Sequence, residues 1–421
     1  MYNFLVAPRH SDLIYDWNSV GGTPIPQKRI MLDDETLRDG LQSPSVKDPP
    51  IDEKIRLLHL MEELGIDMAD IGLPGAGPRA VADVERLARE IVDCRLKIRA
   101  NCAARTHEND IRPVAEISQR AGLLIEVACF LGSSPIRRYT ENWTDDFLLQ
   151  TTEKAVTYTR SLGLEVMYVT EDTSRCDPET VKRLYSTAIN CGATAIVICD
   201  TVGHATPAGA AALIRFVIDE VVKPSRQRIR VDWHGHCDRG LAVANSLAAL
   251  AAGADCAHGT ALGIGERVGN TQLDLLLVNL KLMEVDPWAE QDLTRLKDYC
   301  QAVSDSTGVP IPKNYPVMGD DAFRTATGVH AAAVIKAFKK NDIELANSVY
   351  SGVPSHYFGL DQIIEIGPMS GKSNVVFWLE HRGITASEGL VERIFQLAKA
   401  SDRTLTEEEI LACCQNVSAG I

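Results

Sequence analysis

The sequence contains no apolar run that approaches the roughly 20 residues needed to cross a bilayer, so we expect no membrane-spanning helix. It also lacks an excess of basic residues, because 43 Lys and Arg stand against 57 Asp and Glu, giving a formal net charge of −14. Nucleic acids and anionic membrane surfaces attract basic proteins, so this balance argues against either as the main partner. Residues 1–27 have no signal-peptide pattern, and we expect a cytoplasmic protein.

The 11 cysteines form no Cys-x-x-Cys pair. Cys102, Cys129 and Cys199 lie within short apolar runs, as expected of reduced, buried cysteines in a cytosolic protein. With 45% hydrophobic and 24% charged residues over 421 positions, the composition is that of a globular protein with a sizeable core.

Short apolar runs alternate with longer amphipathic segments from about residue 30 to residue 285. The predicted strands are residues 29–33, 68–72, 96–101, 123–128, 164–169, 193–199, 228–233 and 255–259. Glycines such as Gly65, Gly122 and Gly253 stand where a helix would end before the next strand. Eight strands alternating with helices predict an α/β fold, a closed (β/α)₈ TIM barrel, in preference to an open doubly wound sheet.

We expect three parts in the chain. Residues 1–28 form an N-terminal extension, and residues 29–285 form the TIM-barrel catalytic domain. After residue 285 the alternation stops, and helices are predicted over residues 292–306, 329–339, 387–400 and 406–414. Residues 286–421 are therefore interpreted as C-terminal helical subdomains that cover the active face or contact a second subunit.

A pair of histidines, His234 and His236, follows the seventh predicted strand. Residues i and i+2 of a strand point to the same face, so both imidazoles can reach one cation. Active sites of (β/α)₈ barrels lie at the carboxyl ends of the strands, which is where this pair falls. Arg38-Asp39, Glu171 and Thr201 follow other strands in the same way. Polar residues at several strand ends of one barrel predict a catalytic site.

Three motifs carry a resemblance to a known family: Thr-Leu-Arg-Asp-Gly-x-Gln at residues 36–42, His-x-His, and Gly-x-Gly-Glu-Arg-x-Gly-Asn at residues 263–270. Together they resemble the DRE-TIM metallolyase superfamily, whose members share an HMGL-like barrel. Within it, the chain is similar to the Claisen-condensing isopropylmalate, homocitrate and citramalate synthases. The resemblance implies condensation of acetyl-CoA with a 2-oxo acid at a divalent metal (Mg²⁺, Mn²⁺ or Zn²⁺), giving a 2-alkylmalate-type product and free CoA. It also implies a homodimer in which the C-terminal region reaches the partner's active site.

The resemblance further assigns roles to individual residues of this sequence. The implied metal ligands are Asp39, His234, His236 and Asn270. The implied catalytic residues are Arg38 for the enolate, Glu171 for acid–base work, and His330 of the appended region as general base. Gln42 and Thr201 are the implied contacts of the 2-oxo acid.

The identity of the 2-oxo acid stays open. Arg137 and Arg138 follow the fourth predicted strand and bring two guanidinium groups to the barrel mouth. They are candidates to hold a distal carboxylate or phosphonate, because arginine suits planar bidentate contacts, and this would favour a 2-oxoglutarate-like substrate. An exposed basic loop or a contact with the CoA phosphates is the alternative.

Two other functions compete with the synthase. Gly-Leu-Gln at residues 40–42 is the sequence of hydroxymethylglutaryl-CoA lyases, and Leu41 replaces the glutamate or asparagine of many synthases. The lyases, however, carry a catalytic cysteine in the loop after strand eight, where residues 261–265 have none, and they lack the appended region. A barrel that has lost catalysis and acts as a binding protein is the second alternative, which the presence of all implied ligands disfavours.

Overall fold

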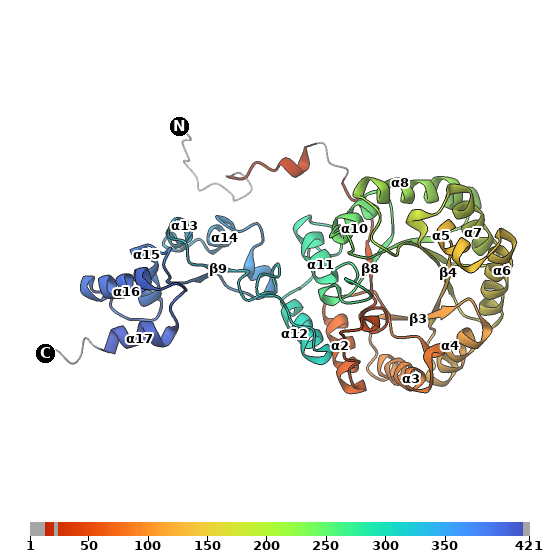
Figure 1. The fold of residues 1–421 in the computed structure, drawn as a ribbon, viewed down its shortest axis with the longest axis horizontal. Helices are drawn as coiled ribbons and strands as arrows, with labels where there is room; N and C mark the ends of the chain where they lie inside the picture. Colours follow the sequence, from red (N-terminus) through yellow and green to blue (C-terminus); the bar gives the residue numbers. More distant parts are fainter. Residues whose placement is uncertain (1–12, 21–23, 416–421) are drawn as a thin grey trace. The chain divides into compact units, whose positions relative to one another are not determined.

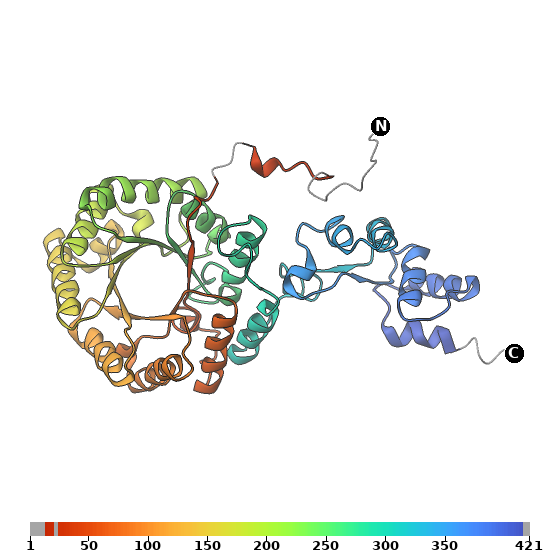
Figure 2. The ribbon, with the colours of Figure 1, turned by 180° about the vertical axis from the view of Figure 1, so that it is seen from behind.

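The computed structural model describes residues 13–20 and 24–415, which divide into two compact units (Figures 1 and 2). One unit comprises Thr23–Gln291 and Arg295–Pro310, and the other comprises the rest of the described chain. Each unit has its own hydrophobic core, so we describe each by itself.

The first unit is a closed barrel of eight parallel strands, as the sequence predicted. The strands are β1 Met31–Asp34, β2 Met68–Asp70, β3 Arg99–Arg105, β4 Glu126–Gly132, β5 Val166–Glu171, β6 Ala195–Asp200, β7 Arg230–Gly235 and β8 Cys256–Gly259. The ring closes where β1 pairs with β8, with Met31 opposite Cys256. Several strands run further than predicted, because the ladder continues to polar residues: Gly132 pairs with Glu171, and Asp200 with Gly235.

Helices surround this barrel, as the ring around the strands in Figure 1 shows. They are α2 Ile51–Glu63, α3 Pro78–Asp93, α4 Glu108–Ala121, α5 Pro135–Glu141, α6 Asp145–Ser161, α7 Pro178–Asn190, α8 Pro207–Val217, α9 Lys223–Ser225, α10 Ala242–Ala251, α11 Leu273–Leu282 and α12 Leu296–Thr307. Capping residues set their ends. Asp177 and Thr206 accept hydrogen bonds from the first turns of α7 and α8, each ahead of a proline. Gly122 ends α4 with φ 68°, a left-handed conformation that favours glycine.

The barrel unit extends beyond residue 285, where the sequence placed the domain boundary. Helix α12 packs beside α2, and its Tyr299 is fully buried. The Tyr299 hydroxyl donates to the carboxylate of Asp34, and the Trp288 indole donates to the carbonyl of Ile30. These buried contacts bind residues 288–307 to the first strand, although the strand–helix alternation that marks a barrel in sequence has already ended.

The second unit is mainly helical: α13 Gly328–Phe338, α14 Ile343–Ser348, α15 Lys372–His381, α16 Glu388–Ala400 and α17 Glu407–Gln415. A two-stranded sheet of β9 Arg324–Thr325 and β10 Ile363–Ile364, which was not predicted, joins them. Helix α15 was also missed, because its first turn is polar. In this first turn Asn374 is fully buried and donates to the carbonyl of Glu365. The polar residues 372–374 therefore begin a helix and do not form a linker.

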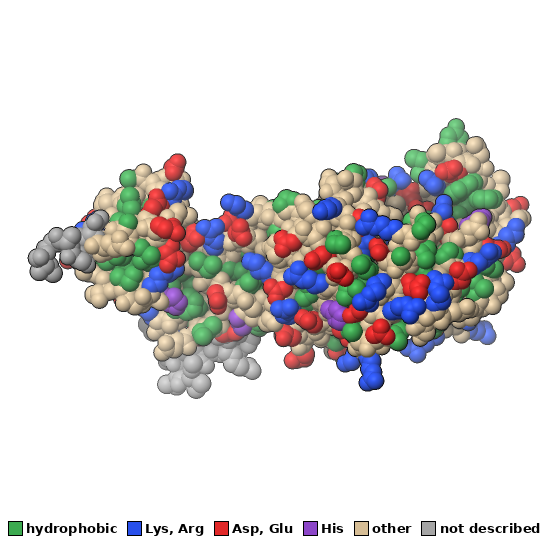
Figure 3. All heavy atoms as spheres, turned by 90° about the horizontal axis from the view of Figure 1, so that it is seen from below, with side chains coloured by type: hydrophobic (Ala, Val, Ile, Leu, Met, Phe, Trp, Pro, Cys, Tyr) green, Lys and Arg blue, Asp and Glu red, His purple; other side chains and the backbone are tan. Residues whose placement is uncertain are grey.

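The surface carries both signs of charge. On the face drawn in Figure 3, Lys and Arg side chains are interspersed with Asp and Glu side chains. Pairs such as Arg86–Glu90 and Arg89–Glu85 on α3 contribute to this pattern. Among the residues that the structure describes, no helix combines the length and the hydropathy required to traverse a bilayer.

Candidate active site

A cavity of about 340 Å³ lies at the carboxyl ends of the barrel strands. Most of the candidate residues from the sequence line it: Arg38, Asp39, Gln42, Glu171, Thr201, His234 and His236. They come from the ends of β1, β5, β6 and β7, which are far apart in the chain, and the closed barrel brings them together.

The loop after β1 positions Arg38 and Asp39. Asp34 accepts a hydrogen bond from the backbone N–H of Thr36, and the carbonyl of Glu35 accepts from the N–H groups of Arg38 and Gly40. These local bonds turn the chain tightly after the strand. As a result, Arg38 and Asp39 present their side chains to the cavity next to each other, with Arg38 Nη1 3.0 Å from Asp39 Oδ1.

Asp39, His234 and His236 form a cluster with the geometry of a cation site. Asp39 Oδ2 lies 3.9 Å from His234 Nε2 and 3.6 Å from His236 Nε2. This oxygen is buried and has no hydrogen-bond partner among the described residues. Burial, with the neighbouring His234, lowers the pKa of His236 to about 4, so its imidazole is neutral and keeps a lone pair for a metal. The residues present therefore fit a divalent cation between them.

Asn270 lies beside His236 in the loop after β8. It forms a backbone bridge to His236, its Nδ2 donates to the carbonyl of Ile264, and its buried Oδ1 has no partner within the described chain. The glycines of the loop make room for it. A Cβ on Gly265, which has φ 146°, would lie 2.2 Å from Asn270 Nδ2. This amide oxygen is the atom through which Asn270 would act as the fourth ligand that the resemblance implies.

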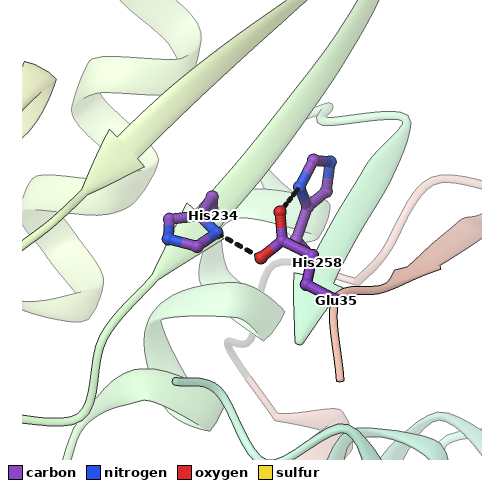
Figure 4. Close-up of side chains that lie close together, drawn as sticks. All are labelled: Glu35, His234 and His258. Carbon is purple, nitrogen blue, oxygen red and sulfur yellow. Dashed lines mark hydrogen bonds and ion pairs between the residues drawn. The ribbon is translucent and has the colours of Figure 1, made fainter. Parts of the chain in front are cut away.

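Glu35, His234 and His258 form a second cluster, drawn in Figure 4. Glu35 Oε2 lies 2.7 Å from His234 Nδ1, and Glu35 Oε1 lies 3.0 Å from His258 Nδ1. These separations are those of imidazole N–H groups in direct contact with carboxylate oxygens, and the His258 contact is a hydrogen bond. The cluster therefore lies behind the metal ligands, on the side of His234 that faces away from Asp39.

Glu35, His258 and Asp70 are not among the site residues predicted from the sequence. Each is almost completely buried, and His258 and Asp70 lie within short apolar strands. An ionisable residue inside such a strand is costly unless it is paired, and that mismatch was the signal available in the sequence.

Arg38 is surrounded by carboxylates. Its Nε donates to Asp70 Oδ2 over 2.7 Å, and its Nη2 lies 3.5 Å from Glu35 Oε1. Burial raises the pKa of Asp70 to about 6, against the lowering effect of Arg38. The guanidinium is thus held in one orientation at the wall of the cavity.

Glu171 and Thr201 stand on neighbouring strand ends. Burial raises the pKa of the Glu171 carboxyl, while the nearby charges of Arg137 and Arg38 act in the opposite direction. The Thr201 hydroxyl accepts a hydrogen bond of 2.8 Å from the backbone N–H of Asp172, which fixes its position. A carboxyl group with a raised pKa inside a cavity is suited to proton transfer.

Of the candidate residues in the barrel unit, Arg137 and Arg138 do not line this cavity. Arg137 stacks over Trp143 and pairs with Glu141 at 3.2 Å, both within the α5–α6 region. Arg138 pairs with Asp145 and donates to Thr180. His330 belongs to α13 of the second unit, where it is exposed and its ring stacks on Tyr350 with 4.2 Å between the centroids.

A model of the HMGL-like family matches residues 29–303 of the chain. Among curated proteins, homocitrate synthase AksA of Methanopyrus kandleri is 31% identical over 92% of this chain and 92% of its own length. The 2-isopropylmalate synthase of Sulfolobus acidocaldarius is 31% identical over 91% of this chain and 95% of its own length. That of Heliobacterium modesticaldum is 31% identical over 92% of this chain and 74% of its own length.

Solved structures of similar fold include hydroxymethylglutaryl-CoA lyases. The enzyme of Bacillus subtilis superposes with a TM-score of 0.56 at 20% identity, covering 69% of this chain and 97% of its own. That of Pseudomonas aeruginosa has a TM-score of 0.55 at 22% identity, covering 67% of this chain and 93% of its own. At these identities the likeness concerns the barrel fold alone.

Proposed function

We propose, on the premise that this chain belongs to the HMGL-like family of the DRE-TIM metallolyase superfamily, that it condenses acetyl-CoA with a 2-oxo acid and releases free CoA. The enzyme is an acyltransferase in which the acetyl group becomes an alkyl substituent of the product. One observation carries the proposal: a buried cluster of Asp39, His234 and His236 directly beside Arg38 in the barrel cavity.

Asp39, His234, His236 and Asn270 would hold the divalent cation, which is Mg²⁺, Mn²⁺ or Zn²⁺. A cation bound there supplies Lewis acidity to the ketone and carboxylate of a 2-oxo acid. Thr201 and Gln42 line the same cavity and would orient that acid. Arg38 stands next to Asp39, where it stabilises the enolate oxygen of acetyl-CoA as negative charge develops on it.

The reaction requires a proton to leave the methyl group of acetyl-CoA and another to reach the new hydroxyl group. The carbanion left on the methyl carbon of acetyl-CoA forms a bond to the ketone carbon of the 2-oxo acid. Water then cleaves the thioester to give a carboxylate and CoA thiol. Glu171, in the cavity and with its pKa raised by burial, is proposed for proton transfer. His330 remains the proposed general base, supplied by a partner subunit in a cytoplasmic homodimer.

The lining of the cavity favours a 2-oxo acid with an apolar side chain. Leu73, Ala128, Phe130, Met167 and Val197 form much of its wall. Each cationic side chain on the wall already has an acidic partner: Arg38 has Asp70, Arg267 has Asp238, and His258 has Glu35. A distal carboxylate would therefore lack an unpaired cation among the described lining residues, and Arg137 and Arg138 lie outside that lining.

The test is a panel of pyruvate, 2-oxobutyrate, 2-oxoisovalerate and 2-oxoglutarate with acetyl-CoA, following thiol release with Mn²⁺ present. We expect thiol release with the apolar acids, and 2-oxoglutarate to react poorly. Arg137→Ala and Arg138→Ala serve as matched variants, and we expect the order of preference to stay unchanged. Selective loss of 2-oxoglutarate turnover in these variants would restore the diacid alternative.

The lyase alternative shares the barrel and the metal ligands. It requires a cysteine in the loop after β8, where residues 261–265 read Ala-Leu-Gly-Ile-Gly. Cleavage of hydroxymethylglutaryl-CoA by the protein, at a rate above its thiol release from acetyl-CoA, would favour the lyase over the synthase.

A further inference from the structure

A line of buried ionisable groups runs from the proposed metal site into the barrel interior. It begins at His234, whose Nε2 faces Asp39 and whose Nδ1 lies 2.7 Å from Glu35 Oε2. The other oxygen of Glu35 meets His258 Nδ1 at 3.0 Å. Figure 4 shows the carboxylate between the two imidazoles, which come from β7 and β8. One carboxylate therefore contacts both rings at once.

The series of contacts continues from the other ring nitrogen of His258. Its Nε2 lies 3.4 Å from Asp232 Oδ2 and 3.9 Å from Asp33 Oδ2. Asp232 in turn accepts from Arg230, with Nε 2.9 Å from Oδ2. Burial alone lowers the pKa of His258, but the charge of Glu35 and hydrogen bonds to Asp232 and Glu35 raise it well above its usual range. The two ring nitrogens of His258 thus each face a carboxylate, Nδ1 that of Glu35 and Nε2 that of Asp232.

The contact with Glu35 determines which ring nitrogen of His234 keeps a lone pair. The separation of 2.7 Å between Glu35 Oε2 and His234 Nδ1 favours a proton on Nδ1, because a carboxylate oxygen only accepts and two facing lone pairs would repel each other. Nε2 is then left with its lone pair toward Asp39. Glu35 itself cannot rotate away, because His258 holds its other oxygen.

We propose that Glu35 and His258 are positioning residues for the metal, with Glu35 fixing the tautomer and ring orientation of His234 and His258 fixing Glu35. The inference rests on the proposed function, since it takes Asp39, His234 and His236 as metal ligands. Partners of this kind typically contribute tenfold to a hundredfold in metal affinity.

The test measures the affinity of the purified full chain for Mn²⁺, without substrate, by electron paramagnetic resonance of the free ion. Glu35→Gln keeps the size of the side chain and removes its charge, and we expect the Kd for Mn²⁺ to rise by about tenfold to a hundredfold. His258→Gln is expected to raise Kd less. In the double variant Kd should equal that of Glu35→Gln alone, because His258 acts only through Glu35.

Two further measurements separate positioning from general stability. Nitrogen-15 NMR of labelled histidine in the metal-free protein should show His234 protonated at Nδ1 in the wild type and a mixture of tautomers in Glu35→Gln. Asp110→Asn is the matched control, because Asp110 is also a buried carboxylate paired with an arginine, Arg105, but lies outside the cavity. Its Kd for Mn²⁺ should equal that of the wild type.

Each outcome has one meaning. An unchanged Kd in Glu35→Gln, or fully additive effects in the double variant, overturns the positioning role while leaving the proposed function intact. A wild-type protein that binds no Mn²⁺, Mg²⁺ or Zn²⁺ overturns the proposed metal site itself. If Glu35→Gln does not fold, Glu35→Asp, which keeps the charge and shortens the reach, should still raise Kd, and an unchanged Kd there contradicts the proposal.

Discussion

The Nε of Arg38 donates to Oδ2 of Asp70 over 2.7 Å, and this bond sets the direction of the guanidinium at the cavity wall. Asp70 is itself held by the backbone N–H of Gly72, 3.2 Å from its Oδ1. The pair links the ends of β1 and β2. In the proposed mechanism, Arg38 therefore needs no rearrangement when negative charge develops on a substrate oxygen beside it.

Asp70→Asn should lower kcat by about tenfold and leave KM nearly unchanged, because Arg38 acts on charge that exists only in the transition state. Asp70→Glu keeps the negative charge, so its kcat should fall less. Steady-state thiol release with both substrates varied gives the two constants, and thermal unfolding checks that the fold persists. An equal loss in kcat for Asn and Glu would contradict a role for the charge.

Asn270→Ala should weaken Mn²⁺ binding without preventing it, because three ligands remain. His236→Ala should abolish binding at micromolar Mn²⁺, because it removes one of two imidazoles around Asp39. Removal of metal with a chelator should stop thiol release in the wild type, and added Mn²⁺ should restore it. Undiminished turnover after dialysis against chelator would contradict the metal assignment.

Asp34 makes stability depend on pH. Burial raises its pKa to about 6, although hydrogen bonds from Thr36 and Tyr299 act against that rise. Since the folded state then binds a proton more tightly than the unfolded state, this contribution to stability is present below about pH 4 and is lost as pH rises toward 6.

The Asp34→Asn variant does not lose this contribution to stability as the pH rises. The stability of the variant relative to the wild type should rise with pH by about 1.4 kcal/mol per pH unit between about pH 4 and 6, then level off. Urea unfolding at several pH values measures the difference. A difference that is constant over this range would show that Asp34 titrates normally in the folded protein.

Ala128→Val tests the apolar wall of the cavity. Ala128 lies in the barrel interior beside Met167 and lines the cavity. The added methyl groups should raise KM for 2-oxoisovalerate more than KM for pyruvate, because the isopropyl group of 2-oxoisovalerate needs more space in the cavity than the methyl group of pyruvate. Equal changes for both acids would indicate that the substrate side chain binds elsewhere. The expected cost in stability is about 1 to 3 kcal/mol and is followed by urea unfolding.

The sequence predicted the barrel for a physical reason, whereas the family resemblance implied the metal ligands, which remain a prediction. Strand–helix alternation repeats eight times, and parallel strands bring Asp39, His234 and His236 to one rim wherever they stand in the chain. The groups behind the ligands were missed, because Glu35 and His258 are 223 residues apart and their pairing depends on barrel closure.

Two other features depend on packing that periodicity does not reveal. The hydroxyl of Tyr299 reaches Asp34 only because α12 packs beside α2, so the barrel unit extends past the predicted boundary. Arg137 and Arg138 were predicted at the barrel mouth as candidates to hold a distal carboxylate, and in the structure they belong to α5, which begins at Pro135, and contact Glu141, Trp143 and Asp145. Helix direction after a strand is set by its cap, here Ser134, and by the neighbouring helix α6.

The most direct test of the account is identification of the product. The purified protein is incubated with acetyl-CoA, Mn²⁺ and 2-oxoisovalerate, thiol release is followed, and the acid formed is identified by mass spectrometry. The account predicts one CoA thiol released for each 2-alkylmalate formed, with both lost in Arg38→Ala and after chelation. Thiol release without a new carbon–carbon bond, or none with any 2-oxo acid in the panel, would contradict it.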